Sequence, residues 1–407
     1  MILRKLRRLL YHKTTIKQHD KPLKILFLIQ NTPMWNIAKQ IYLEGKDDPF
    51  FSFEIMILPP AHLKSDAKVT QLFEEIKNTH SFLDENGVCL PIHYSINQKG
   101  KPLDPLLLKP DIIFYFSPYS SQRNKLTRPK NLGRYANLFY VNYGFLIMNG
   151  DVESIVYKRK DFFQNFNTIC VESHLLKQTV LDLSGTTPNQ ILVSGYPKLD
   201  AYYKKMHSHN SYWNFPETYS KYRIIWNPRW SVKQGTSHFT EYIHLIIDFL
   251  TKNQTIDFVF RPHPNLFRDM LAHKLINKTD KKNIYAKFDE LPNARIDDAE
   301  GDYLSAFASS DLLISDISSL MAEYFPTGKP IIYTKKKEKL FNNIGEALSS
   351  GFYHADSWDI VLATLNKLQA GDDPLKKIRN QIIKEHFPCQ STSSNLILKH
   401  IKKIYKE

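Results

Sequence analysis

The sequence predicts a two-domain α/β protein in which each domain carries a parallel β-sheet, and three observations support this. The chain has 407 residues, which is too long for one ordinary domain and fits two domains of roughly 150–200 residues each. Hydrophobic residues make up 42% and charged residues 24%, as in globular proteins. In both halves, short continuous apolar runs alternate with helical stretches, which is typical of βα units whose strands are buried on both faces.

The apolar runs predict strands because each is short, continuous and followed by polar residues. In the first half the runs occupy residues 24–31, 53–60, 111–121, 137–145, 168–173 and 190–197. In the second half they occupy residues 223–227, 256–262, 293–297, 312–316 and 330–334.

The predicted organisation has two Rossmann-like domains, flanked and joined by shorter segments. We expect a basic N-terminal segment (1–21), a first domain (22–206), a polar and aromatic linker (207–222), a second domain (223–385) and a helical C-terminal tail (386–407). Ligands of open parallel sheets bind at the carboxyl ends of the strands, so we expect the site in a cleft between the two domains.

The chain is basic, with 55 Lys and Arg residues against 41 Asp and Glu residues and a formal charge of +14. This balance favours anionic partners such as acidic lipid or phosphate-bearing substrates. No recognised nucleic-acid motif accompanies the charge, so we expect no nucleic-acid partner. The three cysteines form neither a CxxC pair nor a metal spacing, which indicates a reducing cytoplasm.

Both ends of the chain are basic and amphipathic. Residues 1–10, MILRKLRRLL, would form a helix that is apolar on one side and cationic on the other, which suits an anionic membrane surface. Residues 396–407 have a similar character. No apolar run reaches the roughly 18 residues of a spanning helix, so we expect peripheral association with the inner face of the cell membrane. The alternatives are a solvated tail or a helix docked on the protein itself.

Residues 256–264, IDFVFRPHP, carry the first motif with a chemical interpretation. A predicted buried strand ends in Arg261 and His263, which places a guanidinium and an imidazole at the carboxyl edge of the sheet, in a loop stiffened by two prolines. Arginine offers a fork of donors to phosphate oxygens, and histidine donates to a phosphate or protonates a leaving phosphate. We expect both residues to be catalytic. The alternative is a structural histidine that caps a neighbouring loop.

The second motif follows the predicted strand at residues 312–316. A helix is expected to begin at Ser318 and Ser319, where free backbone N–H groups and the positive end of the helix dipole favour a phosphate. Glu323 lies one turn further on, on the same face as Ser319, where a carboxylate can accept from ribose hydroxyls. The alternative is plain N-capping by serine.

A third motif, WNPRW at residues 226–230, supplies Asn227 and Arg229 at the end of the first strand of the second domain. Its alternative role is a rigid turn with core tryptophans. The two motifs described above also form phosphate-friendly loops that follow strands of the same domain. Loops of this kind that converge on one cleft indicate a nucleotide diphosphate.

Together with GYPKLD at residues 195–200, the three motifs resemble those of the CDP-glycerol glycerophosphotransferases, which include teichoic-acid polymerases and related capsule-polymer enzymes. The resemblance covers roughly residues 24–395 and is strongest from about 190 to 335. It implies a GT-B fold, in which two Rossmann-like domains with parallel sheets face a central cleft.

The resemblance also implies roles for particular residues. His263 would contact the donor pyrophosphate, Ser318 and Ser319 would bind the phosphates, and Glu323 would bind the ribose. Asn227, Arg229 and Arg261 are added to the donor site on charge and position alone. Residues 386–395, HFPCQSTSSN, resemble the closing motif of the family, but Gln390 stands where an acidic residue is common, which argues against a role for this segment.

The first half departs from the family pattern at the acceptor side. Family polymerases carry a His-Gly pair after a strand of this half, and the histidine is the presumed base, whereas this chain has Asn142-Tyr143-Gly144. Tyrosine, with an ordinary pKa near 10, is a poor base at neutral pH. Three explanations remain open. The base comes from elsewhere, such as Glu172 or His174; positioning and charge neutralisation suffice; or the chain is catalytically weak.

Acceptor binding is assigned to loops that follow the strands of the first domain. These loops hold Asn31, Tyr119, Asn142 and Tyr143, whose polar and aromatic groups suit a sugar or polyol phosphate. The alternative is ordinary loop chemistry.

The expected reaction is attack by a hydroxyl of a cell-surface polymer on the β-phosphorus of a CDP-alditol, with glycerol as the first choice of alditol. The expected acceptor is a polyol phosphate or glycan, either lipid-linked or free. No convincing metal spacing occurs, so we expect no tightly bound cofactor and leave loose assistance by Mg²⁺ open. Two alternatives remain: a GT-B glycosyltransferase that uses a CMP- or UDP-sugar, and a non-catalytic nucleotide-binding partner in an assembly complex.

Overall fold

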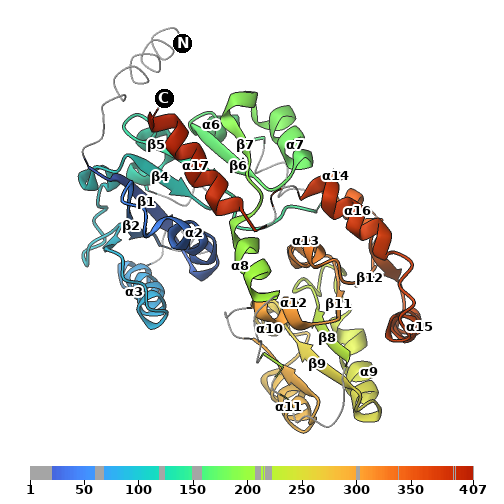
Figure 1. The fold of residues 1–407 in the computed structure, drawn as a ribbon. Coiled ribbons are helices and arrows are strands. Elements are labelled where there is room, and N and C mark those ends of the chain that lie inside the picture. Colours follow the sequence, from blue (N-terminus) through green and yellow to red (C-terminus); the bar gives the residue numbers. More distant parts are fainter. Residues whose placement is uncertain are drawn as a thin grey trace. The chain divides into compact units, whose positions relative to one another are not determined.

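The chain folds into two compact units, shown in the computed structural model of Figure 1. Unit 1 consists of residues 1–143, 155–200 and 389–407, and unit 2 consists of residues 144–154 and 201–388. The structure describes residues 21–59, 68–118, 124–148, 158–206, 212–213, 215, 222–298, 303–337, 339–387, 389 and 391–406. The predicted membrane-binding helix at the N-terminus and Tyr119 therefore lie outside the described residues.

Unit 1 is built on a parallel sheet. Among its described residues the strands follow the order β3-β2-β1-β4-β5-β6-β7, and each neighbouring pair is parallel. This order is that of a doubly wound Rossmann-type sheet. The strands are β1 (Leu23–Ile29), β2 (Phe51–Ile57), β3 (Ile92–Tyr94), β4 (Ile112–Tyr115), β5 (Asn137–Val141), β6 (Thr168–Val171) and β7 (Ile191–Val193).

Helices and short 3-10 turns connect these strands. They are α2 (Thr32–Gly45), α3 (Val69–Glu85), η1 (Pro105–Leu108), η3 (Lys125–Thr127), α4 (Pro129–Leu132), α6 (Lys160–Phe163), α7 (His174–Ser184), η4 (Pro188–Gln190) and α17 (Ser393–Lys406). The helix α8 (Pro197–Met206) begins in unit 1 and continues into unit 2. In Figure 1, α2 and α17 lie side by side, and a Cβ added at Gly45 of α2 would meet Leu398 of α17 at 2.9 Å.

Unit 2 repeats the same architecture with a second parallel sheet. Its described strands follow the order β10-β9-β8-β11-β12-β13. They are β8 (Tyr222–Asn227), β9 (Ile256–Phe260), β10 (Ala294–Ile296), β11 (Leu312–Ser315), β12 (Ile331–Thr334) and β13 (Tyr353–Ala355). Two Rossmann-like domains with parallel sheets confirm the fold class that the sequence predicts.

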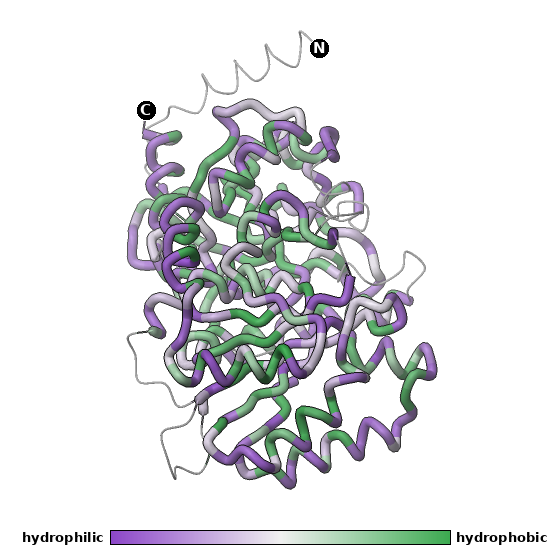
Figure 2. The backbone as a smooth tube through the Cα atoms, turned by 90° about the vertical axis from the view of Figure 1, so that its right-hand side faces the viewer, coloured by the Kyte–Doolittle hydropathy of each residue, from purple (hydrophilic) through white to green (hydrophobic). Residues whose placement is uncertain are grey.

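The helices of unit 2 bury one face each. In α9, Tyr242, Ile246 and Leu250 recur at four-residue spacing and are buried, so the other side of the helix can be polar. Figure 2 shows this alternation of hydrophobic and hydrophilic residues along the outer helices. The helices are α9 (Phe239–Lys252), α10 (Leu266–Ala272), α11 (Lys278–Asp289), α12 (Tyr303–Ser309), α13 (Ser319–Tyr324), η5 (Phe325–Thr327), α14 (Asn343–Ser349), α15 (Trp358–Gln369) and α16 (Lys376–His386).

All the apolar runs named from the sequence are strands, whereas two edge strands were not predicted. β3 and β13 have three residues each, and β3 has no fully buried residue. Such short, half-exposed strands lack the continuous apolar run on which the sequence-based prediction depends.

The segment after β5 packs within unit 2, although its sequence neighbours belong to unit 1. The amide of Asn342 donates to the Leu146 carbonyl at 2.7 Å, and Met148 forms an antiparallel bridge with Phe341. Gly345 permits this close approach, since an added Cβ would lie 2.3 Å from the Ile147 carbonyl oxygen. The sequence predicts a continuous first domain from 22 to 206 and gives no sign of this exchange.

The closing motif is part of a structural connection within unit 1. The carboxylate of Asp200, in GYPKLD, accepts from the backbone N–H groups of Ser393 at 3.0 Å and Ser394 at 2.8 Å, at the start of α17. Gly195 of the same motif has φ +78, and an added Cβ would lie 2.5 Å from Ser393 Oγ. The two motifs therefore fix α17 to unit 1, which gives them a structural function.

Candidate donor site in unit 2

The three predicted donor motifs lie at the carboxyl edge of the unit 2 sheet. β9, β8 and β11 are neighbours in that sheet, so the loops that follow them are also neighbours. Asn227 connects these loops. Its side-chain amide donates to the backbone carbonyl of Arg261 at 2.8 Å, and its backbone carbonyl accepts from Ser315 Oγ at 2.8 Å. Asn227 is buried and occupied by these contacts, so the structure gives it a structural role, and its contact with a donor stays a prediction.

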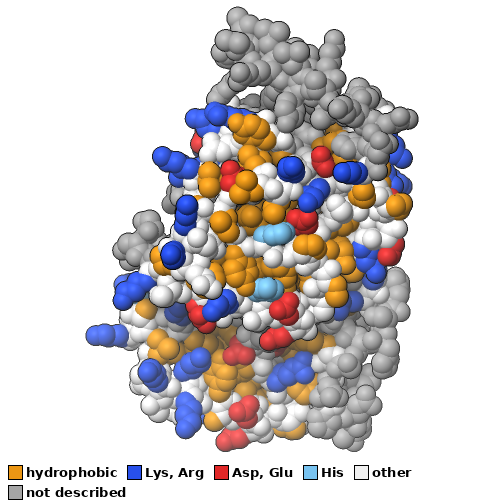
Figure 3. All heavy atoms as spheres, turned by 90° about the vertical axis from the view of Figure 1, so that its left-hand side faces the viewer, with side chains coloured by type: hydrophobic (Ala, Val, Ile, Leu, Met, Phe, Trp, Pro, Cys, Tyr) orange, Lys and Arg blue, Asp and Glu red, His pale blue; other side chains and the backbone are white. Residues whose placement is uncertain are grey.

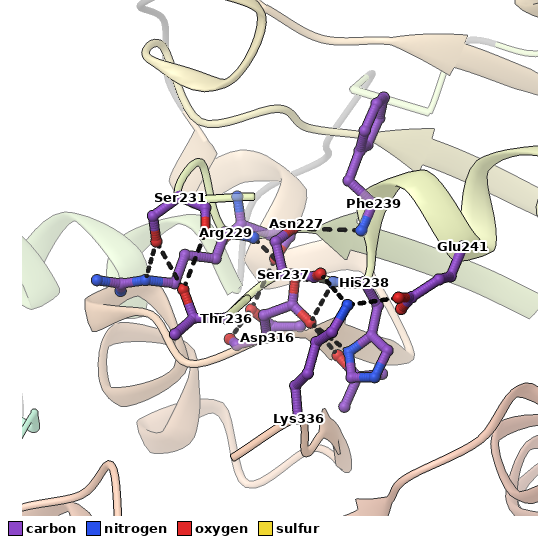
Figure 4. A network of polar contacts seen from close by, with 12 residues as sticks. Asn227, Arg229, Ser231, Thr236, Ser237, His238, Phe239, Glu241, Asp316 and Lys336 are labelled. Carbon is purple, nitrogen blue, oxygen red and sulfur yellow. Dashed lines mark hydrogen bonds and ion pairs between the residues drawn. The ribbon is translucent and has the colours of Figure 1, made fainter. Parts of the chain in front are cut away.

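Asp316, directly after β11, organises the loops of this edge (Figure 4). Its carboxylate is 1% exposed and accepts from the Arg229 backbone N–H at 2.9 Å and from His238 Nδ1 at 3.0 Å. It also accepts from Thr334 Oγ1, at the end of β12, at 2.7 Å. One buried carboxylate thus fixes the segments that follow β8, β11 and β12.

His238 supports this arrangement from the start of α9. Its backbone N–H also donates to Asp316, and its ring stacks on Tyr242 with 4.7 Å between centroids. Sequence reasoning assigned no role to Asp316 or His238. The position of Asp316, a polar residue directly after an apolar strand, indicates a role at the edge of the sheet. His238 lies 78 residues away in the sequence, so no local pattern predicts its contact with Asp316.

Arg229 presents a half-buried guanidinium at this edge. Its Nε donates to Ser231 Oγ at 2.7 Å, and its Nη1 donates to the Ile317 carbonyl at 3.1 Å and to Met148 Sδ at 3.0 Å. Among the described residues no carboxylate forms an ion pair with this guanidinium. Burial lowers the pKa of Arg229, and the negative charge of Asp316 opposes that shift, so the group remains a cation with neutral partners.

His263 has a defined tautomer. The backbone N–H of Asn265 donates to its Nδ1 at 3.0 Å, so in the neutral ring the proton resides on Nε2. Burial, together with the positive charges of Arg229 and Arg268, lowers the pKa of His263 to about 4. At neutral pH His263 is therefore an uncharged donor, and no described residue accepts from its Nε2.

Arg261, which the sequence predicts as catalytic, is engaged in an ion pair. Its Nη1 lies 2.5 Å from Asp297 Oδ2, and its guanidinium packs over the Tyr303 ring at 5.2 Å. The Tyr303 hydroxyl in turn donates to Glu323, which is 3% exposed. Arg261 and Glu323 are thus joined through Tyr303, and their roles toward a donor stay predictions.

The predicted serine pair begins α13. Ser318 is the N-cap, with Oγ accepting from the Leu320 N–H at 3.2 Å, and Ser319 is the first helical residue and exposed. The contact between Arg229 and the Ile317 carbonyl brings the guanidinium to the loop that precedes this pair. Trp230, the residue after Arg229, has its ring centroid 6.1 Å from that of His263, and the positive charge of Arg229 lowers the pKa of His263. The structure therefore brings Arg229, His263 and the serine loop together.

This group of residues suits an anion. Arg229 provides a cation without a carboxylate partner, and His263 provides a neutral N–H donor. Such donors in a partly buried place bind phosphate oxygens more strongly than they would in water. The negative charge of a bound phosphate would also raise the pKa of His263 from its low value, which makes the imidazole a better proton donor in the complex.

The residues predicted for the acceptor lie in unit 1, and nothing in the structure tests their contact with an acceptor. Asn31 caps α2, with Oδ1 accepting from the Met34 N–H at 3.3 Å. Asn142 accepts from the Tyr140 hydroxyl at 2.8 Å, and the Tyr143 carbonyl accepts from Tyr196 at 2.8 Å. Their roles stay predictions.

No group of three or more His, Cys, Asp or Glu side chains in the described part of the chain could hold a metal ion. The absence of a tightly bound cofactor stays a prediction.

The ionisation of His263 is directly testable. We expect NMR of the labelled imidazole to give a pKa of about 4 in the free protein and the Nε2–H tautomer above it. Since this pKa lies below the ordinary 6.5, the unfolded chain binds more protons than the folded one between about pH 6.5 and 4, and stability falls as pH decreases through that window. A pKa above 6, or a proton on Nδ1, would show that the geometry of the loop is wrong.

The organising role of Asp316 predicts a stability difference between two variants. Asp316→Ala leaves several buried donors without an acceptor and should lower the unfolding free energy by about 3 kcal/mol or more. The matched control Thr334→Val removes one of these hydrogen bonds and should cost about 1 kcal/mol. Urea unfolding followed by intrinsic tryptophan fluorescence measures both, and equal effects of the two variants would contradict the assignment.

The chain is similar to known proteins both in sequence and in structure. The sequence model described as CDP-glycerol:poly(glycerophosphate) glycerophosphotransferase matches residues 153–342. No curated protein sequence matches the chain. A structure of the wall teichoic acid polymerase TagF is similar at 15% identity and a TM-score of 0.59, over 100% of this chain and 95% of that chain. UDP-GlcNAc 2-epimerase from Neisseria meningitidis, bound to UDP-GlcNAc, is similar at 12% identity and a TM-score of 0.59, over 94% of this chain and 100% of that chain.

The two structural likenesses show the fold, which is of the GT-B type. The sequence match covers the RPHP, WNPRW and serine-pair motifs on which the predicted resemblance depends. The predicted resemblance to the CDP-glycerol:poly(glycerophosphate) glycerophosphotransferase family is therefore confirmed for residues 153–342.

Proposed function

We propose that the protein transfers glycerol phosphate from CDP-glycerol to a hydroxyl group of a teichoic-acid polymer and releases CMP. The family description names CDP-glycerol and poly(glycerophosphate), and one structure of the wall teichoic acid polymerase TagF, which has the same fold, was soaked with CDPG. The observation that carries the proposal is the guanidinium of Arg229, which lies near His263 and the serine loop without a carboxylate partner among the described residues.

The chemistry follows from these groups. The acceptor oxygen forms a bond to the β-phosphorus, the bond from that phosphorus to the bridging oxygen breaks, and CMP leaves with the bridging oxygen. Arg229 and the Nε2–H of His263 stabilise the negative charge on the transferring phosphate and the leaving group. Ser318 and Ser319 contribute by binding phosphate oxygens, and Glu323 by binding the ribose. Arg261 holds the strand end that carries His263, through its pair with Asp297.

We propose that the Arg229 cation and the neutral donors of the site suffice without a tightly held metal ion. Loosely bound Mg²⁺ would add to the charge on the diphosphate, and turnover in EDTA compared with turnover in added Mg²⁺ measures its share.

The catalytic assignment predicts a loss of turnover in two variants. Arg229→Gln and His263→Gln should each lower CMP release from CDP-glycerol about 10²–10³-fold, because each removes one donor to the developing charge. Arg268→Gln, which removes an exposed cation close enough to influence His263, serves as the control and should stay near the wild-type rate.

The assay uses purified protein, CDP-glycerol and an oligomer of glycerol phosphate as acceptor, with CMP as the readout. Full CMP release by His263→Gln would refute the site. A CMP-sugar or UDP-sugar that replaces CDP-glycerol as the preferred donor would instead support a glycosyltransferase, and donor binding without turnover on any acceptor would support a non-catalytic binding protein.

We further propose that the protein associates with a membrane surface and acts on a lipid-linked acceptor, as in teichoic-acid or capsule assembly. None of the described helices is long and apolar enough to cross a membrane. The apolar side of α17 packs within unit 1, since Ile397 and Ile401 are fully buried, so only its basic side remains for a surface. On the face drawn in Figure 3, Lys and Arg side chains are dispersed among acidic and hydrophobic ones. We assign the membrane contact to the N-terminal segment because its sequence, MILRKLRRLL, combines apolar and cationic side chains.

This assignment predicts a difference in vesicle binding. The full chain should sediment with vesicles that contain anionic lipid, and a chain lacking residues 1–20 should remain in solution, because the segment carries both the apolar and the cationic side chains. Equal sedimentation of the two proteins would contradict the assignment.

A further inference from the structure

A buried carboxyl group lies at the carboxyl edge of the unit 1 sheet. Glu172 directly follows β6 and is 7% exposed. Its backbone position is fixed because Ser173 caps α7, with Oγ accepting from the Leu176 N–H at 3.1 Å. The backbone of residue 172 is therefore held between a strand and a capped helix.

The neighbours of Glu172 are the ends of two other strands. β5 pairs with β6 in parallel register, Val141 with Cys170, so continuation of this register brings Tyr143 beside Glu172. On the other side the Ser194 N–H donates to the Val171 carbonyl at 3.1 Å, directly after β7. Glu172 thus lies between strand ends at the edge where open parallel sheets bind their ligands.

The carboxyl group of Glu172 has no structural partner that explains its burial. Among the described residues, no side chain forms a hydrogen bond or an ion pair with it. Buried carboxyl groups in proteins are normally paired or fully hydrogen-bonded. The contrast with Asp200 and Asp316 is clear, since each of those buried carboxylates accepts from two or more backbone or side-chain donors. The burial of the Glu172 carboxyl group is therefore better explained by a function than by a structural role.

The ionisation of Glu172 agrees with this interpretation. Burial raises the pKa of Glu172 to about 7 against the opposing effect of its own backbone N–H, and no neighbouring charge contributes. The titratable groups on the adjoining elements, none of which contributes to this shift, are Cys170 on β6, His174 on α7, Tyr143 after β5, and Tyr196 and Lys198 after β7. A carboxyl group with a pKa near the working pH is suited to general-base catalysis.

We propose that Glu172 is the general base that accepts the proton of the acceptor hydroxyl, an inference that rests on the proposed function. The acceptor O–H bond breaks and its proton passes to the Glu172 carboxylate while the oxygen bonds to the β-phosphorus of the donor. CMP leaves with the bridging oxygen, and Glu172 then releases the proton to water. The choice between Glu172 and His174, which the sequence leaves open, falls on Glu172 because His174 is exposed on the first turn of α7.

The kinetic test compares Glu172→Gln and Glu172→Asp with the control His174→Gln. Glu172→Gln keeps the shape of the side chain and removes its basicity, so kcat should fall about 10²–10⁴-fold while the Kd for CDP-glycerol stays within about twofold. In the wild type and in His174→Gln, kcat should rise with pH through about 7, and this limb should be absent from Glu172→Gln. Glu172→Asp should retain the limb with a lower plateau.

A second measurement does not depend on turnover. Since the folded pKa of about 7 lies above the ordinary value of 4.5, the folded protein binds more protons than the unfolded chain in that window, and wild-type stability falls as pH rises through it. Glu172→Gln should lack this dependence and should have a higher Tm than the wild type at pH 8. This comparison also shows that the variant is folded.

Three results would overturn the proposal. Retention of wild-type kcat and of the pH limb by Glu172→Gln would exclude Glu172 as the base. Loss of the limb in His174→Gln instead would transfer the role to His174. If the wild type binds CDP-glycerol but releases no CMP with any acceptor, the proposed function itself is refuted. If the wild type releases CMP and Glu172→Gln does so at the same rate, only the assignment of Glu172 as the base is refuted.

Discussion

The candidate donor site depends on one buried carboxylate, that of Asp316. Its oxygens accept hydrogen bonds from the loop after β8, from the start of α9 and from the end of β12, while its own backbone continues into the serine pair. A charged acceptor in a buried place forms strong hydrogen bonds, and the loss of any donor would leave charge uncompensated. The position of Arg229 therefore follows from Asp316, and the charge that the site offers to a ligand follows from Arg229.

The partners of the charged side chains explain why this edge of the sheet can bind an anion. Arg261 forms an ion pair with Asp297, and the Asp316 carboxylate accepts from several donors, so the charge of each has a partner within the protein. Among the described residues the Arg229 guanidinium has neutral partners alone, one of which is the weakly accepting sulfur of Met148. A phosphate oxygen is a much better acceptor than a thioether, so a bound diphosphate can replace that contact at little cost. The sequence distinguishes none of these arginines, because the difference lies in the partners that folding brings to them.

Much of the fold could be predicted from the sequence because each buried strand is a continuous apolar run, and the donor motifs directly follow three of those runs. What could not be predicted depends on contacts between distant residues. Asp316 and His238 are 78 residues apart, and Asp200 meets Ser394 across 194 residues. The exchange of residues 144–148 into unit 2 depends on a glycine at 345 that leaves room for a carbonyl group. Glu172 was named from the sequence only as one of two candidates, and its burial, visible only in the structure, separates it from His174.

A structure of the protein with CDP-glycerol would test the central claim most directly. The account predicts that oxygens of the diphosphate lie within hydrogen-bond distance of the Arg229 guanidinium and of His263 Nε2, next to the serine pair at the start of α13. Phosphates bound elsewhere, with Arg229 still in contact with Met148 and with His263 Nε2 still without a ligand, would contradict it.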